Sequence, residues 1–128
     1  MKILEVLIPF KDGIKVGEYA PDVFLVLEVG RELQLPPYME NVLKVRAVKA
    51  LTPQEIPEVA KRLHDELKKI PLDKKVALVL SGPLALSALF FAFQGIHRPL
   101  AVGQFNPGKG DYDWFLIDPE GLRNFFLI

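Results

Sequence analysis

The chain has 128 residues, the usual size of one domain, and we expect a single domain spanning residues 1–128. Half of the residues are apolar and a quarter are charged, which is enough apolar side chain for a core and argues against disorder. The 16 basic and 16 acidic side chains balance, whereas general nucleic-acid binders usually carry a basic excess, so we expect no general DNA binding.

The sequence contains no cysteine, which excludes disulfides, thiol catalysis and cysteine-based metal sites. The amino-terminal residues do not have the layout of a secretory signal, because Glu5 and Pro9 interrupt their apolar run. The most apolar stretch, residues 84–93, is about half the length that a membrane span requires. We therefore expect a cytoplasmic protein that does not associate with membranes.

The first part of the chain is predicted to contain three strands. Residues 2–9 form an apolar run ended by proline, and residues 23–29 are β-branched or aromatic and bounded by proline and glycine. Residues 42–50 alternate in part between basic and apolar side chains, which indicates a half-exposed strand. The turn signal at residues 11–13 and the two prolines at positions 36 and 37 interrupt regular structure.

A helix is predicted to begin near Thr52. Thr52 is a good cap, Pro53 fits the first helical position, and Glu55 completes a capping box. Apolar side chains then recur every three or four residues, which predicts an amphipathic helix that ends before Pro71.

Residues 76–105 are predicted to form a strand, a helix and a parallel strand joined by a right-handed crossover. Residues 76–80 are continuously apolar, as in a central strand covered on both faces. The helix expected between Gly82 and Gly95 is apolar almost all round, which indicates that part of it packs against a second subunit. With a further strand at residues 114–117, we expect an α/β fold whose mixed sheet has about five or six strands and two main helices, in a homodimer.

The turn Ser81-Gly82-Pro83 is the first candidate site, because ligands of open α/β sheets bind beyond the carboxyl ends of the strands. Free N–H groups at the start of a helix attract anions such as phosphate. Gly82 lets a ligand approach the backbone, and the Ser81 hydroxyl can donate a hydrogen bond. The alternative is that Ser81 serves as an ordinary helix cap.

The second candidate is formed by Gln104, Asn106 and Lys109, at the end of the next parallel strand. If the two strands are neighbours, this loop opens on the same edge of the sheet as Ser81. An amide can read a base edge, and Lys109 can face a phosphate. The alternative is a solvated Asn-Pro-Gly turn.

The histidines and the acidic pair are weaker candidates. His97 has the titration range of a general base, but it lies in a helix-to-strand connection, for which a surface or helix-end role is the alternative. His64 falls on the polar face of the first helix, where we expect it to be solvated. Asp111 and Asp113 share one face of a strand with nothing specified opposite them. We therefore expect no metal ion and no cofactor.

Three runs of residues resemble a known family: Leu80 to Leu86, His97 to Val102, and Gln104 to Pro107. They are similar to small CRISPR-associated ring-nuclease proteins related to CARF and SAVED sensor domains, over residues 76–112. The resemblance implies a CARF-like, Rossmann-like fold, a homodimer, and binding of a cyclic oligoadenylate, an RNA-like second messenger of antiviral defence. It places the phosphate-facing turn at Ser81, Gly82 and Pro83, and a histidine implicated in cleavage at His97.

Asn106 departs from this family, because the nuclease pattern carries an aspartate there and an amide cannot act as a base. We therefore expect binding of a cyclic oligoadenylate, with slow ring cleavage as an additional hydrolase activity. That cleavage would need no metal, with the Ser81 turn stabilising charge and His97 assisting proton transfer. The alternative, from a different class, is a non-enzymatic homo-oligomeric interaction or assembly domain whose apolar helix is the interface.

Overall fold

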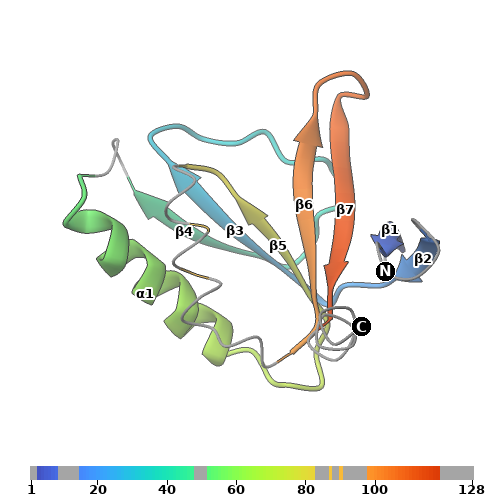
Figure 1. The fold of residues 1–128 in the computed structure, drawn as a ribbon, viewed down its shortest axis with the longest axis horizontal. Helices are drawn as coiled ribbons and strands as arrows, with labels where there is room; N and C mark the ends of the chain where they lie inside the picture. The colour runs from blue at the N-terminus through green and yellow to red at the C-terminus, as the bar shows by residue number, and fades with distance from the viewer. Residues whose placement is uncertain are drawn as a thin grey trace, which may run out of the picture.

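The computed structural model describes residues 3–8, 15–47, 52–82, 87, 90 and 98–118. These residues form a seven-stranded mixed sheet with one helix packed against it (Figure 1). The helix, α1, spans Glu55–Lys68, and the strands are β1 (Leu4–Ile8), β2 (Lys15–Tyr19), β3 (Val23–Val29), β4 (Val42–Ala47), β5 (Val76–Leu80), β6 (Leu100–Asn106) and β7 (Asp111–Ile117). The predicted α/β class and mixed sheet are confirmed, but the sheet has seven strands rather than five or six.

The strands follow the order β2-β1-β7-β6-β5-β3-β4. The four strands β4, β3, β5 and β6 run parallel to one another, β7 returns antiparallel to β6, and β1 pairs parallel with β7. The antiparallel hairpin of β1 and β2 completes the sheet. The predicted parallel pairing of β5 with β6 is confirmed, with a register that runs from Val76 opposite Leu100 to Val79 opposite Gly103.

Each face of the sheet carries its own apolar core. On the helix face, α1 covers β3, β5 and β6, and Phe90 joins this core with its side chain fully buried. The opposite face, here called the loop face, is covered by side chains of β1 and β2 and by the segment 31–41 that links β3 to β4; its buried members are Leu4, Val6, Tyr19, Phe24, Val26, Met39, Ala77, Val79, Ala101 and Trp114. Strand β5 is buried on both faces, as its continuous apolar run predicts.

Helix α1 begins at Glu55, three residues after the predicted cap. The Thr52 carbonyl accepts the N–H groups of Glu55 and Ile56, at 3.0 and 3.2 Å. The Glu55 carboxylate in turn accepts the Thr52 N–H at 3.0 Å, which is the reciprocal half of the predicted capping box. The apolar stripe faces the sheet, since Val59, Ala60, Leu63 and Leu67 are buried.

Strand β2 is absent from the sequence-based prediction, whereas the other strands coincide with predicted segments to within a few residues. The helix predicted for residues 82–95 falls mainly outside the described residues, although Ser87 and Phe90, which are described, are both helical. The turn at residues 11–13 and the carboxyl-terminal segment from residue 122 also lie outside the described residues. No helix in the described part of the chain is long and apolar enough to cross a membrane.

Candidate functional site at the carboxyl edge of the sheet

The carboxyl ends of β3 and β5 lie side by side in the middle of the parallel part of the sheet (Figure 1). The Ser81 N–H donates to the Leu27 carbonyl at 3.1 Å, so the β3–β5 ladder continues one residue beyond Leu80. The chain leaves β3 toward β4 at the edge of the sheet, and it leaves β5 toward β6 in the opposite direction. Open α/β sheets bind their ligands at such a reversal of strand order.

Ser81 and Gly82 occupy this switch point. Ser81 is half-buried and Gly82 is exposed. Gly82 has a φ of 138°, a backbone conformation that residues with a side chain rarely adopt, so the glycine is required by the geometry of the turn. Pro83 lies outside the described residues.

Glu28, on β3, lies beside Ser81, which follows β5. The sequence alone did not single out Glu28 as a site residue. Since Leu27 is level with Leu80, Glu28 is level with Ser81, and strand alternation directs both side chains to the loop face. Glu28 is 2% exposed. Its Oε2 accepts the Leu33 N–H at 2.6 Å, and its Oε1 lies 3.0 Å from Arg46 Nε on β4, an ion pair without the direction of a hydrogen bond.

The second predicted group, Gln104, Asn106 and Lys109, lies on the hairpin between β6 and β7. Asn106 Nδ2 donates to Asp113 Oδ2 at 2.9 Å, and Lys109 Nζ donates to Asp113 Oδ1 at 2.6 Å. Asn106 Oδ1 accepts the Gly108 N–H at 3.0 Å. These two hydrogen bonds hold the pKa of Asp113 below its usual value, and the one from Lys109 has the larger effect. The polar groups of Asn106 and Lys109 therefore brace the hairpin.

The two predicted groups share one edge of the sheet, but the strands that carry them separate. Pairing of β5 with β6 ends at Val79 and Gly103, although β6 continues to Asn106, and Figure 1 shows the two strands diverging beyond that point. Within the described part of the chain, no hydrogen bond joins Ser81 or Gly82 to Gln104, Asn106 or Lys109.

His97, the catalytic candidate, lies outside the described residues, but its neighbour Arg98 is described. Arg98 is buried at the amino end of β6, on the edge opposite Ser81. Its guanidinium donates to the carbonyls of Ile70, Pro71 and Lys74 at 2.8, 2.8 and 2.5 Å. Arg98 therefore fixes the turn that follows α1, and the role of His97 stays a prediction.

His64 corrects the expectation of a solvated side chain. It is half-buried, and its ring meets Phe90 edge-on with 6.2 Å between centroids. The helix turns this side chain toward the apolar cover of the sheet rather than toward water.

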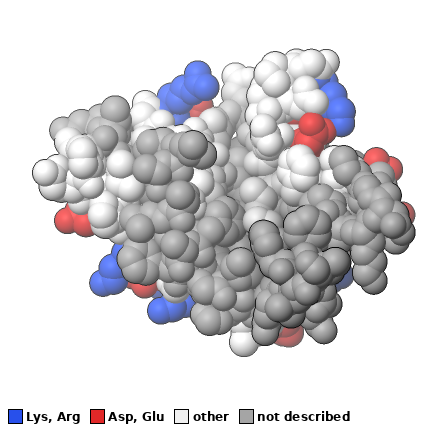
Figure 2. All heavy atoms as spheres, in the orientation of Figure 1, with Lys and Arg blue, Asp and Glu red and all other residues white. Residues whose placement is uncertain are grey.

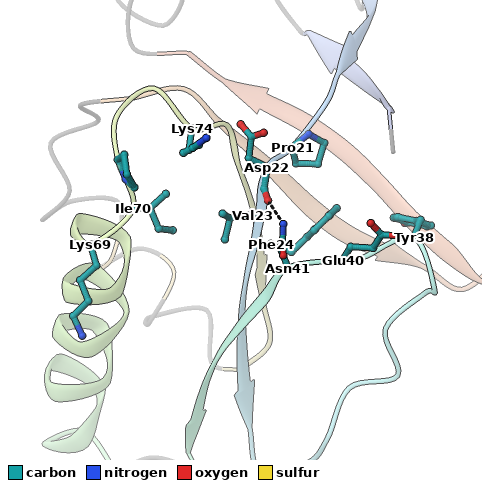
Figure 3. Close-up of a pocket in the computed structure, with 11 residues that line it drawn as sticks. Pro21, Asp22, Val23, Phe24, Tyr38, Glu40, Asn41, Lys69, Ile70 and Lys74 are labelled. Atoms are coloured by element: carbon teal, nitrogen blue, oxygen red, sulfur yellow. Dashed lines mark hydrogen bonds between the residues drawn. The ribbon is translucent and has the colours of Figure 1, made fainter. Parts of the chain in front are cut away.

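A pocket of about 500 Å³ opens at the amino edge of the sheet, between the end of α1 and the start of β3 (Figure 3). The residues that line the pocket come from three separate segments, 21–24, 38–41 and 69–74. No local pattern in the sequence could therefore predict this pocket. Asn41 has a positive φ of 52° and donates from Nδ2 to the Asp22 carbonyl at 3.1 Å. Charges of both signs line the pocket, and it lies on the edge away from Ser81, which makes it the weaker candidate.

Among the described residues, no three His, Asp or Glu side chains gather in a way that would hold a metal ion. No family model, curated protein or solved structure matches this chain.

Proposed function

We propose that this protein binds a phosphate-bearing nucleotide ligand at the carboxyl edge of its sheet, with the Ser81-Gly82 turn as a phosphate contact. The observation that carries the proposal is the position of this turn, at the switch point between β3 and β5. The φ of 138° at Gly82 supports it, since a glycine here leaves the backbone open to a ligand.

The ligand that we propose is a cyclic oligoadenylate, and the proposed role is that of a CRISPR-associated sensor. The support is the resemblance carried by residues 80–86, 97–102 and 104–107. A turn that binds phosphate through neutral donors needs no basic excess, and the chain has none. Binding is favoured over cutting, because the Asn106 amide is held by Asp113 and Gly108 and cannot serve as a base. Slow ring cleavage would depend on His97.

Thermal melting with cyclic tetra-adenylate and cyclic hexa-adenylate tests the proposal. A ligand present at 100 times its dissociation constant stabilises the folded state by about 2.7 kcal/mol, which raises the Tm by several degrees. AMP serves as the control for a single phosphate and base. Ser81→Ala should keep the unliganded Tm and reduce the shift. If neither ring shifts the Tm at high concentration, the proposal is wrong.

The homodimer is a second proposal, and it also supports the competing role of a non-enzymatic assembly domain. Its support is the almost fully apolar sequence of residues 84–93, because one chain can cover only part of such a helix. Sedimentation of the unliganded protein tests it, since a monomer across the accessible concentrations would contradict both the homodimer and the assembly role. A dimer that melts identically with and without either ring would favour assembly over sensing.

A further inference from the structure

Glu28 is a carboxylate buried where the same face of its strand is otherwise apolar. Phe24 and Val26, which precede it on that face of β3, both belong to the loop-face core. Burying a carboxylate costs several kcal/mol unless it is paired and hydrogen-bonded. The Leu33 N–H at 2.6 Å and Arg46 Nε at 3.0 Å supply that pairing. Glu28 therefore holds two elements in place, the segment after β3 and the side chain of Arg46.

Arg46 faces Glu28 directly in the parallel register of β3 and β4. Its side chain is 58% exposed, although its partner is buried. Glu28 contacts the guanidinium through Nε, the nitrogen nearest the backbone. Among the described residues, no hydrogen bond is made by the two terminal nitrogens, Nη1 and Nη2, of this half-exposed side chain. A guanidinium held in this way presents the paired N–H groups that match a phosphate or carboxylate in a bidentate fashion.

Two more basic residues lie close to Arg46. Lys44 Nζ lies 3.8 Å from Glu28 Oε2 and 3.9 Å from Glu32 Oε1. Arg31 is exposed and follows Gly30, whose N–H donates to the Ala47 carbonyl at 2.8 Å. A group of basic side chains projects at the upper left of Figure 2, on the side where Figure 1 places the carboxyl ends of β3 and β4. The carboxyl ends of β3 and β4 therefore carry more positive than negative charge, with three basic side chains and two acidic ones, Glu28 and Glu32.

We infer that Arg46, positioned by Glu28 and assisted by Lys44, is an anion site for a phosphate group at the carboxyl edge of the sheet. Glu28 is level with Ser81 on one side and with Arg46 on the other, so β4 and β5 flank it. The backbones of Ser81 and Arg46 are two strand spacings apart, or about 10 Å. The identity of the ligand rests on the proposed function, in which Arg46 takes a second phosphate of the same molecule. The anion site itself does not depend on it.

Calorimetric titration with inorganic pyrophosphate at low salt tests the anion site, and parallel titrations with cyclic tetra- and hexa-adenylate test its role. Arg46→Ala should weaken pyrophosphate binding about tenfold, the loss expected of one charge-assisted bidentate contact. Arg46→Lys should recover part of that loss, because an ammonium keeps the charge but lacks the fork. Lys61→Ala, which removes an exposed charge from α1, is the control and should bind as the wild type does.

The variant Glu28→Gln distinguishes two effects of Glu28 on anion binding: the positioning of the Arg46 side chain and the repulsion of the anion by the Glu28 charge. The variant removes a negative charge beside the site, so an unpositioned Arg46 would bind pyrophosphate more tightly. Positioning predicts weaker binding, because the amide can still accept the Leu33 N–H but no longer fixes Arg46 by charge. The Arg46 Nε–H resonance should broaden in this variant while the backbone amide spectrum is retained. Tighter binding would overturn the role given to Glu28.

The outcomes distinguish this inference from the proposed function. Failure of the wild type to bind pyrophosphate, or undiminished binding by Arg46→Ala, overturns the anion site. Undiminished ring binding by Arg46→Ala overturns its role toward the ligand and leaves the proposed function standing. Pyrophosphate binding that depends on Arg46, without binding of either ring, supports the anion site and overturns the proposed function. Arg46→Lys keeps a positive charge beside the buried Glu28 carboxylate, so this variant tests the site even if Arg46→Ala or Glu28→Gln does not fold.

Discussion

Gly103 lies directly opposite Trp114 in the β6–β7 pair, and the indole ring fills the space where a side chain at residue 103 would begin. A Cβ at Gly103 would lie 2.8 Å from Cζ3 and 2.9 Å from Cη2 of Trp114. The indole also meets Phe24 edge-on, with 6.0 Å between ring centroids. The ring therefore cannot move without disturbing the loop-face core.

Gly103→Ala should lower the free energy of unfolding by about 1–3 kcal/mol, the usual cost of overpacking a core. Urea unfolding followed by the fluorescence of Trp114, the single tryptophan, measures the change. Gly108→Ala is the matched control, since its Cβ would meet Asn106 Oδ1 at 3.3 Å in an exposed turn. Its effect should stay within about 0.5 kcal/mol. Equal losses in the two variants would contradict the packing of Trp114 over Gly103.

Removal of Arg98 should lower the stability of the protein. Arg98 is 6% exposed and donates to three carbonyls in the turn that follows α1. Arg98→Ala leaves these carbonyls without their donor and should cost about 2–3 kcal/mol. Arg98→Lys should recover little, because an ammonium cannot reach three acceptors with the geometry of a planar guanidinium.

Urea unfolding measures these losses, and Arg62→Ala provides the control. Arg62 is exposed and makes a single long contact of 3.4 Å to the Arg46 carbonyl. Its removal should change stability by less than about 0.5 kcal/mol. If Arg98→Ala is as mild as Arg62→Ala, the turn after α1 does not depend on Arg98.

All three tyrosines should resist ionisation in the folded protein. Burial raises the pKa of Tyr19 to about 12, against an ordinary value near 10, and burial also raises the pKa values of Tyr38 and Tyr112. The unfolded chain therefore releases these protons at a lower pH than the folded chain does. Stability is retained below about pH 10 and falls as the pH rises toward 12.

Tyrosinate absorbance measured against pH, in the folded protein and in urea, checks this expectation. Tyr19→Phe should reduce the alkaline loss of stability, because one raised pKa is removed. At neutral pH the variant should cost about 1 kcal/mol, since the Tyr19 hydroxyl donates to the Val76 carbonyl at 3.0 Å. Half-titration of all three tyrosines near pH 10 in the folded protein would contradict their burial.

The strands of the parallel core could be predicted from the sequence because their signals are local. Residues 23–29 are mostly apolar and lie between Pro21 and Gly30, residues 76–80 are a continuous apolar run that ends before Ser81, and both form strands with these bounds. β2 could not be predicted in this way, since Lys15 to Tyr19 mixes charged residues with a glycine. β2 forms a strand because it pairs with β1, from Leu4 opposite Tyr19 to Ile8 opposite Lys15, and not because its own residues favour strands.

The candidate site also contains residues that the sequence predicts and one that it does not. Ser81 and Gly82 could be found because a turn after a central strand has a known place in an α/β sheet. Glu28 could not be found from the sequence, because there it is only one charged residue near the end of a strand. Its burial depends on Arg46 and on Leu33, and only the register of β3 against β4 brings Arg46 beside it.

Asp113 provides a test of whether the hairpin residues are free for a ligand. Lys109 and Asn106 both donate to its carboxylate and hold its pKa below the usual value. The stabilisation from this carboxylate is present above the pKa of the unfolded chain and is lost as the pH falls through the folded value. Lys109→Ala should therefore raise the pKa of Asp113 toward its usual range, and Asn106→Ala should raise it less.

Carboxyl carbon shifts measured by NMR as a function of pH report the pKa of Asp113 directly. Lys61→Ala, with its charge on α1, should leave that pKa unchanged and controls for the loss of one positive charge. A pKa of Asp113 that does not respond to Lys109→Ala would mean that Lys109 is not held by this carboxylate in solution. Lys109 would then be available to a phosphate, and the hairpin would return as a second contact for the ligand alongside Ser81.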